Sequence, residues 1–317
     1  MRKLALGNSG LSIAPLMLGG NVFGWTADEK ASFAVLDAFV DGGGNAIDTA
    51  DVYSAWIPGH VGGESETMIG KWLKASGKRD KVIIATKVGV KIAEGREGLS
   101  RRWIDQAIED SLRRLQTDYV DLYFAHRDDQ NTPLEESLDA FDRLVKAGKV
   151  RSIGASNYEA PRLAKALEVS RANGLASFTV LQPWFNLMDR DKFEGPLQDL
   201  CVKENIGVVP YFGLASGFLS GKYRSEADLE GKPRSYRAKD YLNPRGLGVL
   251  NALDEVAATH DATPAQVALA WLAAQPAVVA PIASATSVAQ VDDLLRSAAI
   301  NLSAEDIALL DKASRAG

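Results

Sequence analysis

Short runs of β-forming residues alternate with amphipathic helical patterns along almost the whole chain, and this alternation restricts the fold most. Several runs, such as VIIAT and IGVVPY, are continuously apolar, as strands covered on both faces should be. The predicted strands are residues 16–19, 46–48, 82–86, 119–124, 152–155, 179–181, 207–211 and 278–282. Eight strands separated by helices favour a closed parallel barrel, although an open doubly wound sheet alternates in the same way.

The length of the chain fits one large barrel. It has 317 residues, and such barrels commonly run to about 250 residues or more. Its 46% apolar content is ample for a large core. No linker, internal repeat or low-complexity tract is evident. We therefore predict an α/β fold with a single (β/α)8 TIM barrel domain over residues 1–317, preceded by a short β-hairpin and ending in a helical extension.

Charge and cysteine content exclude several classes of partner. The net charge is −5 and the basic residues are scattered, which argues against a nucleic acid or an anionic membrane. The N-terminus lacks the apolar stretch of a signal peptide, and no segment approaches the roughly 18 apolar residues of a membrane span. The single cysteine, Cys201, excludes an internal disulfide and fits a reducing compartment. We expect a cytoplasmic protein; the sequence does not predict its oligomeric state.

Local motifs predict where helices begin and where loops are long. Capping boxes of the S/T-x-x-E/Q type are expected at Thr26–Glu29, Thr132–Glu135, Thr263–Gln266 and Ser287–Gln290, with Pro133 and Pro264 at the first helical position. Residues 51–62 and 221–246 interrupt the alternation of strands and helices and are predicted to be long loops. Loops of such length in a compact domain are usually functional or disordered.

Polar side chains occupy nearly every predicted strand end. The series is Asp48 with Tyr53 beyond it, Lys87, His126, Ser156 with Asn157, Gln182 and Tyr211. In a TIM barrel the C-terminal strand ends converge on one face, where active sites are built. Any single residue could be polar only because it meets a loop. The whole series favours a site.

The segments AIDTADVYS, VIIATKVG, VDLYFAHR, GKVRSIGASN, VLQPWFNL and VPYFGLASGFLSGKY together are highly specific. Through them the chain resembles the aldo-keto reductase superfamily, from its N-terminal hairpin to its last helix. Within the superfamily it looks most similar to the bacterial branch related to potassium-channel β-subunits. The resemblance implies an oxidoreductase that reduces a small aldehyde or ketone, sugar-like compounds included, by hydride transfer.

The resemblance implies a catalytic tetrad of Asp48, Tyr53, Lys87 and His126. Tyr53 would be the acid in reduction and the base in oxidation. Because free tyrosine has a pKa near 10, a nearby Lys87 ammonium would have to favour its anion, and Asp48 would keep Lys87 charged. His126 would donate a hydrogen bond to the carbonyl oxygen. Alternatively, Asp48 and Lys87 form a structural ion pair, Tyr53 caps a loop and His126 begins a solvated loop.

The resemblance also implies NADPH as cofactor, with NADH less expected. No G-x-G-x-x-G follows a predicted strand, and the resemblance implies that the cofactor lies instead across the mouth of the barrel. The expected cofactor contacts are Ser156, Asn157, Gln182, Tyr211, Leu214, Ser216, Lys222, Arg237, Ser284, Thr286, Gln290 and Asp293. Arg237 aligns with an arginine for the 2′-phosphate in the channel-related branch. Where relatives usually have Ser-Pro after the stacking aromatic, this chain has Phe212-Gly213, and where many have Asn it has Leu294.

Aromatic residues and one arginine are expected at the substrate. Trp25, Trp56, Trp184 and Arg127 would border the pocket, although packing at the barrel edge also explains the tryptophans. No metal is expected, since the histidines lack ligand spacing. Two alternatives stay open: a nucleotide-binding regulatory subunit with little turnover, and the same site working mainly as an alcohol dehydrogenase.

Overall fold

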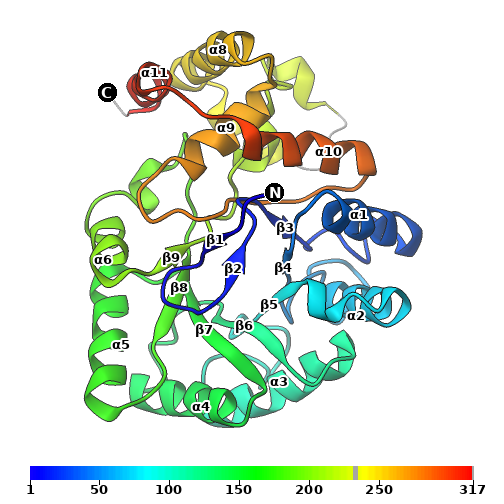
Figure 1. The fold of residues 1–317 in the computed structure, drawn as a ribbon, viewed down its shortest axis with the longest axis vertical. Coiled ribbons are helices and arrows are strands. Elements are labelled where there is room, and N and C mark those ends of the chain that lie inside the picture. Colours follow the sequence, from blue (N-terminus) through cyan, green and yellow to red (C-terminus); the bar gives the residue numbers. More distant parts are fainter. Residues whose placement is uncertain (231–234, 316–317) are drawn as a thin grey trace.

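The structure is a computed structural model that describes residues 1–230 and 235–315 (Figure 1). Within these residues a sheet of eight parallel strands curls into a barrel in the order β10-β3-β4-β5-β6-β7-β8-β9. The strands are β3 (Met17–Gly19), β4 (Ala46–Asp48), β5 (Ile83–Val88), β6 (Val120–Ala125), β7 (Val150–Ser156), β8 (Phe178–Gln182), β9 (Gly207–Val208) and β10 (Ile282–Ala283).

The barrel is closed between β9 and the segment that leads into β10. Val208 N donates to Ala277 O over 2.9 Å, and Val279 N donates to Val208 O over 2.8 Å. Ile282 N donates to Pro210 O over 2.9 Å. These bonds confirm the closed barrel and exclude the open sheet. The seventh and eighth strands are shorter than predicted, and one reason is that Pro210 has no N–H to donate to a ladder.

Helices surround the strands, as Figure 1 shows. They are α1 (Glu29–Asp41), α2 (Glu64–Ser76), α3 (Arg101–Leu115), α4 (Leu134–Lys146), α5 (Ala160–Asn173), α6 (Pro196–Glu204), α7 (Ser235–Ala238), α8 (Pro244–Thr259), α9 (Pro264–Ala273), α10 (Val288–Arg296) and α11 (Ala304–Ser314). The predicted C-terminal helical extension is present, because α11 packs on α8.

The N-terminal hairpin of β1 (Leu4–Ala5) and β2 (Ser12–Ile13) closes one end of the barrel. Its Leu6 and Ile13 are buried in one apolar cluster with strand residues such as Leu122. Asn8 N donates to Asn205 O, just before β9 begins, so the hairpin lies at the N-terminal ends of the strands. Figure 1 shows it across the middle of the ring. The C-terminal ends of the strands lie at the other end, where the expected site residues are.

Two of the four predicted helix starts are correct. Thr263 forms a full capping box with Gln266, with Pro264 at the first helical position. Ser287 caps α10, although its Gln290 side chain bonds Thr286 instead of completing the box.

The other two starts are wrong by one or two residues. The N-cap of α1 is Asp28, whose shorter side chain accepts from Ala31 N over 2.8 Å. The N-cap of α4 is Pro133, one residue later than the expected Thr132, and the Thr132 hydroxyl donates to Asp129 Oδ2. At α1 an aspartate accepts the capping bond proposed for the threonine, whereas α4 has no side-chain cap.

Gly70 sits where α2 and α3 touch. A Cβ built at Gly70 would lie 2.0 Å from the carbonyl oxygen of Arg114. We expect Gly70→Ala to lower the free energy of unfolding by about 1–3 kcal/mol, because backbone cannot move aside cheaply. Urea denaturation measures this. Gly248→Ala, in α8 with open space around its Cβ, is the control and is expected to be neutral or stabilising. Equal effects at the two glycines would contradict the close approach.

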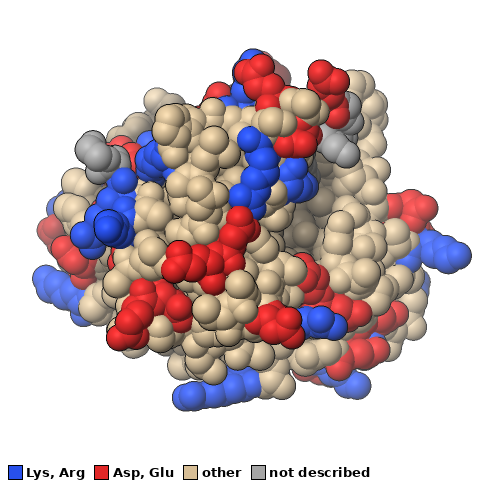
Figure 2. All heavy atoms as spheres, turned by 90° about the horizontal axis from the view of Figure 1, so that it is seen from above, with Lys and Arg blue, Asp and Glu red and all other residues tan. Residues whose placement is uncertain are grey.

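The structure shows how the charged side chains and the single cysteine are placed. Acidic and basic side chains are interspersed over the face in Figure 2, and no basic patch dominates that view. Among the described helices, none combines the length and apolar character required to cross a bilayer. Cys201 is fully buried in α6, and burial raises the pKa of its thiol to about 12. Such a thiol is unreactive at neutral pH.

Candidate active site

The C-terminal strand ends bring the expected catalytic side chains together. Asp48 is the last residue of β4, Lys87 is the penultimate residue of β5, and His126 follows β6 directly. Ser156 and Gln182 end β7 and β8 and are register partners in the sheet. The positions therefore follow from strand lengths and from parallel pairing, which aligns these ends at one edge.

Lys87 is the centre of a buried hydrogen-bond network. Its Nζ donates to Asp48 Oδ2 over 2.7 Å, to the carbonyl of Thr49 over 2.8 Å and to the Tyr53 hydroxyl over 2.8 Å. The Tyr53 hydroxyl in turn donates to Asp48 Oδ2 over 3.0 Å. Gln182 Nε2 donates to Asp48 Oδ1 over 2.9 Å, so both carboxylate oxygens are bonded. Lys87 and Asp48 are only 0% and 2% exposed, which keeps their interaction strong.

Burial dominates the protonation of this network. Desolvation raises the pKa of the Tyr53 phenol well above its ordinary value, and the Asp48 carboxylate raises it further. Desolvation lowers the pKa of the Lys87 ammonium, although Asp48 opposes that shift. The pKa of Tyr53 is therefore raised in this structure, and not lowered as expected from the neighbouring Lys87. Tyr53 is therefore a neutral phenol at neutral pH, the form that carries the proton needed in reduction.

His126 faces the same site as a neutral imidazole. Burial lowers its pKa well below the ordinary value, and the charges of Lys87 and Arg127 lower it further. Its ring packs edge-on against Tyr53, with 6.1 Å between ring centroids. His126 Nδ1 is buried without a hydrogen-bond partner among the described residues. A neutral ring carries one N–H, which suits donation to a substrate oxygen.

The expected ligands of the nicotinamide carboxamide are bonded to one another. Ser156 Oγ donates to the carbonyl of Gln182 over 2.9 Å. Asn157 has a left-handed backbone, with φ of 57°, and its Nδ2 donates to the carbonyl of His126 over 3.0 Å. The Tyr211 hydroxyl donates to Asn157 Oδ1 over 2.6 Å. These bonds hold the polar groups and the Tyr211 ring at the mouth of the barrel.

The segment after β9 is a cradle of left-handed residues beneath Lys222, in which the N–H groups of Ala215 and Gly217 already donate to Phe212 O and Leu214 O, each over 2.8 Å. Ala215, Ser216 and Gly217 follow Leu214 and have positive φ values of 46°, 57° and 91°. A Cβ built at Gly217 would lie 3.1 Å from Lys222 Nζ, so the ammonium covers this glycine. This ammonium suits a phosphate.

Arg237 lies over an aromatic ring beside this cradle. Its Cζ is 5.0 Å from the centroid of the Phe212 ring, and Phe212 itself has a positive φ of 58°. Arg237 is exposed and belongs to α7. Two other basic residues of the long loop, Lys232 and Arg234, lie outside the described residues.

The residues expected at the adenosine end have partners within the protein. Ser284 Oγ donates to Asn21 Oδ1 over 2.6 Å. Thr286 bonds Gln290 Oε1 through its N–H and through its hydroxyl. Asp293 Oδ1 accepts from Gln266 Nε2 over 2.7 Å, which ties α10 to α9. Gln290 and Asp293 therefore have structural roles in this state.

Two groups of aromatic rings border the site. Trp56 packs on Trp25 and Tyr53, with centroid distances of 6.0 Å and 6.1 Å, and it is 51% exposed. Trp184 packs on Phe212 at 4.9 Å and on Tyr211 at 6.1 Å. Arg127 is exposed beside His126. The rings form the apolar walls that a small organic ligand needs.

Sequence reasoning missed Asp189 as an organising residue. Its Oδ2 accepts from Trp184 Nε1 over 2.9 Å, from Asn186 Nδ2 over 2.9 Å and from the Tyr241 hydroxyl over 2.7 Å. Tyr241 belongs to the long loop after β9. Asp189 therefore joins that loop to the wall of the pocket. The local sequence carries no signal for this, since Tyr241 is 52 residues away.

A buried acidic pair behind the tetrad was also missed. Asp51 is 1% exposed, and neither carboxylate oxygen has a hydrogen-bond partner in the described chain. Burial raises its pKa well above the ordinary value, and the charge of Glu66 adds to this. Glu66 accepts from Thr86 and from Arg114 Nε. The aspartate in DTADVYS was visible, but its burial was not.

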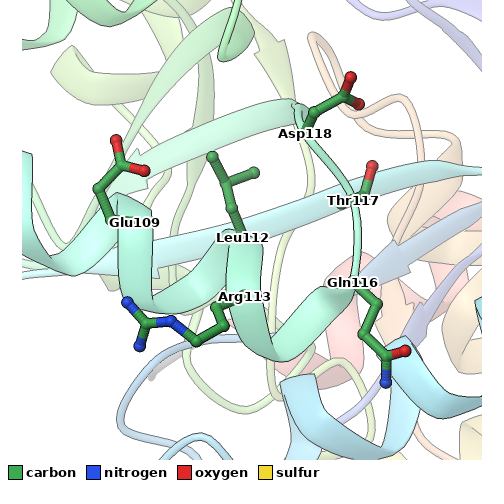
Figure 3. A pocket seen from close by; sticks show the side chains of 6 residues that line it. All are labelled: Glu109, Leu112, Arg113, Gln116, Thr117 and Asp118. Atoms are coloured by element: carbon green, nitrogen blue, oxygen red, sulfur yellow. The ribbon is translucent and has the colours of Figure 1, made fainter.

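A hollow on the surface need not belong to this site. Figure 3 shows one at the end of α3 and the turn that leads to β6, lined by Glu109, Leu112, Arg113, Gln116, Thr117 and Asp118. It lies at the N-terminal end of β6, whereas His126 follows the C-terminal end. Within residues 1–230 and 235–315, no group of three or more His, Cys, Asp or Glu side chains could hold a metal ion.

A sequence model described as the aldo/keto reductase family matches residues 15–315. The chain belongs to this family. It is therefore an oxidoreductase of the aldo-keto reductase type, and members of this family typically use NAD(P)H and act on small molecules.

Relatives from bacteria and fungi match along nearly the whole chain. The uncharacterized oxidoreductase YrpG of Bacillus subtilis is 34% identical over 98% of this chain and 95% of its own length. Aldo-keto reductase YhdN of the same organism is 33% identical over 94% of this chain and 87% of its own. Norsolorinic acid reductase stcV of Emericella nidulans is 32% identical over 94% of this chain and 78% of its own.

Proposed function

We propose that this aldo-keto reductase uses NADPH to reduce a small aldehyde or ketone to the alcohol, with the whole chain of residues 1–317 acting as one barrel domain. The main observation in support is the hydrogen-bond network in which Lys87 Nζ bonds the Tyr53 hydroxyl and Asp48, next to a neutral His126. A proton donor, a cation and a hydrogen-bond donor converge where a carbonyl oxygen would become negative.

The residues at the barrel mouth fit NADP(H). The Lys222 ammonium, which covers the cradle of Ala215, Ser216 and Gly217, suits a pyrophosphate. The Tyr211 ring offers a stacking surface for nicotinamide, and its hydroxyl is fixed by Asn157. The cofactor, when bound, supplies the hydride that reduces the carbonyl carbon.

The residues of the site supply the proton, stabilise the charge that forms and orient the carbonyl group. Tyr53 gives its phenolic proton to the carbonyl oxygen, for which its O–H must turn from Asp48 Oδ2 toward the substrate. Lys87 stabilises the phenolate that remains. His126 donates its N–H to the carbonyl oxygen and orients it. Asp48 holds Lys87 in place, and Gln182 holds Asp48.

The protonation state of Tyr53 suits reduction. Oxidation needs Tyr53 as a phenolate base, whereas burial and Asp48 raise the pKa of this phenol. The names of fungal relatives as norsolorinic acid reductases also support reduction. A panel of aldehydes and ketones with NADPH and NADH, and of alcohols with the oxidised cofactors, tests the proposal. Tight NADPH binding without turnover of any compound would favour a regulatory nucleotide-binding subunit. That outcome would also support the resemblance to the branch related to potassium-channel β-subunits.

We expect Arg237→Ala to raise the KM for NADPH by about tenfold to hundredfold and to leave the KM for NADH nearly unchanged. A hydrogen bond to a charged partner contributes roughly 1.5–3 kcal/mol, and each 1.4 kcal/mol is about tenfold. The Ser284 and Thr286 hydroxyls supply no positive charge for a 2′-phosphate. Initial rates at saturating substrate give both constants.

Lys239→Ala is the matched control for this prediction, because Lys239 is an exposed cation two residues further along the same segment. Equal losses with both cofactors at Arg237 would indicate a pyrophosphate contact or packing on Phe212. Unchanged constants would move the 2′-phosphate site to another basic residue, with Arg234 the next to replace.

A further inference from the structure

Arg127 is an exposed guanidinium beside the active site. It follows His126 directly after β6. Within residues 1–230 and 235–315 it makes no hydrogen bond and no ion pair. The hydrogen-bonding donors of its planar fork are therefore available to a ligand.

The acids that follow Arg127 in the sequence are engaged elsewhere. Asp128 Oδ1 accepts from Arg162 Nε over 2.8 Å. Asp129 Oδ2 accepts from the backbone N–H of Leu99 over 2.8 Å and from a threonine hydroxyl over 2.7 Å. The two neighbours best placed to neutralise Arg127 are thus unavailable.

The carboxylates of the site itself are also engaged. Asp48 is bonded by Lys87, Tyr53 and Gln182. Asp189 receives three donors on one oxygen. The positive charge of Arg127 therefore stands unopposed by these acids at the mouth of the barrel.

Hydrogen bonds tie the backbone just before Arg127 to residues of the site. Asn157 bonds the carbonyl of His126 through Nδ2 and the Tyr211 hydroxyl through Oδ1. Tyr211 is therefore two hydrogen bonds away from the backbone that leads into Arg127. Burial raises the pKa of the Tyr211 phenol, and the charges of Arg127 and Arg237 oppose this, which agrees with the placement.

We propose that Arg127 binds a carboxylate of the substrate, so that the preferred substrates are carbonyl compounds that carry a carboxylate on an aromatic or otherwise apolar body. The proposal rests on the proposed reductase function and names its substrate class. One planar guanidinium fork matches one planar carboxylate. The apolar body would lie between the Trp56 and Trp184 ring groups.

Two aldehydes that differ mainly in charge test this. With saturating NADPH, wild-type enzyme should show a kcat/KM for 4-formylbenzoate at least about tenfold above that for 4-formylbenzamide. Arg127→Gln should remove this preference, mainly through a higher KM for the carboxylate. Arg127→Lys should retain part of it, since the charge stays and the fork is lost. Arg113→Gln, at the far end of the barrel, should retain all of it.

Binding of unreactive analogues gives an answer that does not depend on turnover. Benzoate should bind the enzyme–NADP⁺ complex at least about tenfold more tightly than benzamide by calorimetry, and Arg127→Gln should equalise them. A preference that survives Arg127→Gln, or equal losses with both aldehydes, would overturn the proposal. If no carbonyl compound is reduced, the reductase function fails, and the benzoate comparison still decides whether Arg127 is an anion site.

Discussion

Tyr53→Phe is expected to lower kcat for carbonyl reduction by about 10²- to 10⁴-fold, the usual contribution of a general acid. Only the hydroxyl is lost, and that hydroxyl is bonded to Lys87 and Asp48. The ring keeps its contacts with Trp56 and His126, so the fold should persist. Steady-state kinetics with the best aldehyde of the panel, beside fluorescence titration of NADPH, measures both effects.

Tyr119→Phe is the matched control, because Tyr119 lies just before β6, at the opposite end of the barrel. It should leave kcat unchanged. A Tyr53→Phe enzyme that binds NADPH normally and keeps near wild-type kcat would show that another group is the acid. A variant that no longer binds NADPH would show that the hydroxyl serves the structure of the mouth.

Lys87→Met is expected to be at least as damaging to reduction. Lys87 Nζ is the cation in contact with the Tyr53 hydroxyl, at 2.8 Å, and it stabilises the phenolate that forms as the proton leaves. Alcohol oxidation adds a pH signature. The base must be deprotonated, so the oxidation rate rises with pH toward the raised pKa of Tyr53. Without the ammonium that pKa rises further, and the profile moves to higher pH.

Stability has to be measured beside this, because Lys87→Met leaves the buried carboxylate of Asp48 without its partner. Removing one member of a buried pair costs about 3–5 kcal/mol. A double variant that adds Asp48→Asn removes both charges and should recover much of the stability but none of the activity. Substantial activity in Lys87→Met with an unchanged pH profile would leave Lys87 a structural role only.

The barrel could be predicted from the sequence because its information is local and periodic. Continuous apolar runs such as VIIAT are typical of strands covered on both faces, and β5 lies there. Strand lengths were predicted less well where the ladder depends on distant partners. The seventh strand reaches only Val208 as a regular strand, because closure next to Pro210 relies on single bonds to residues 277–282.

The positions of the site residues could be predicted, whereas their electrostatic balance could not. Parallel strands align their C-terminal ends, so Asp48, Lys87 and Gln182 had to meet. The direction of the Tyr53 pKa shift depends on how deeply the phenol is buried and on which oxygen of Asp48 it faces. Neither the burial of the phenol nor its orientation toward Asp48 can be predicted from the sequence.

Contacts between distant loops were beyond prediction for the same reason. Asp189 collects donors from Trp184, Asn186 and Tyr241, and only the first two are near it in the chain. The family resemblance directs attention to residues that touch the cofactor. A residue that positions the surrounding loops carries no comparable motif.

The deep burial of Cys201 makes the protein suitable for site-specific fluorescent labelling. It is the only cysteine of the chain, and its thiol has a pKa of about 12, so maleimide reagents will not modify it in the folded state at neutral pH. Lys239→Cys would place a single reactive thiol on the exposed segment beside Arg237. A dye attached there reports whether that segment moves when NADPH is added, with no native cysteine to remove first.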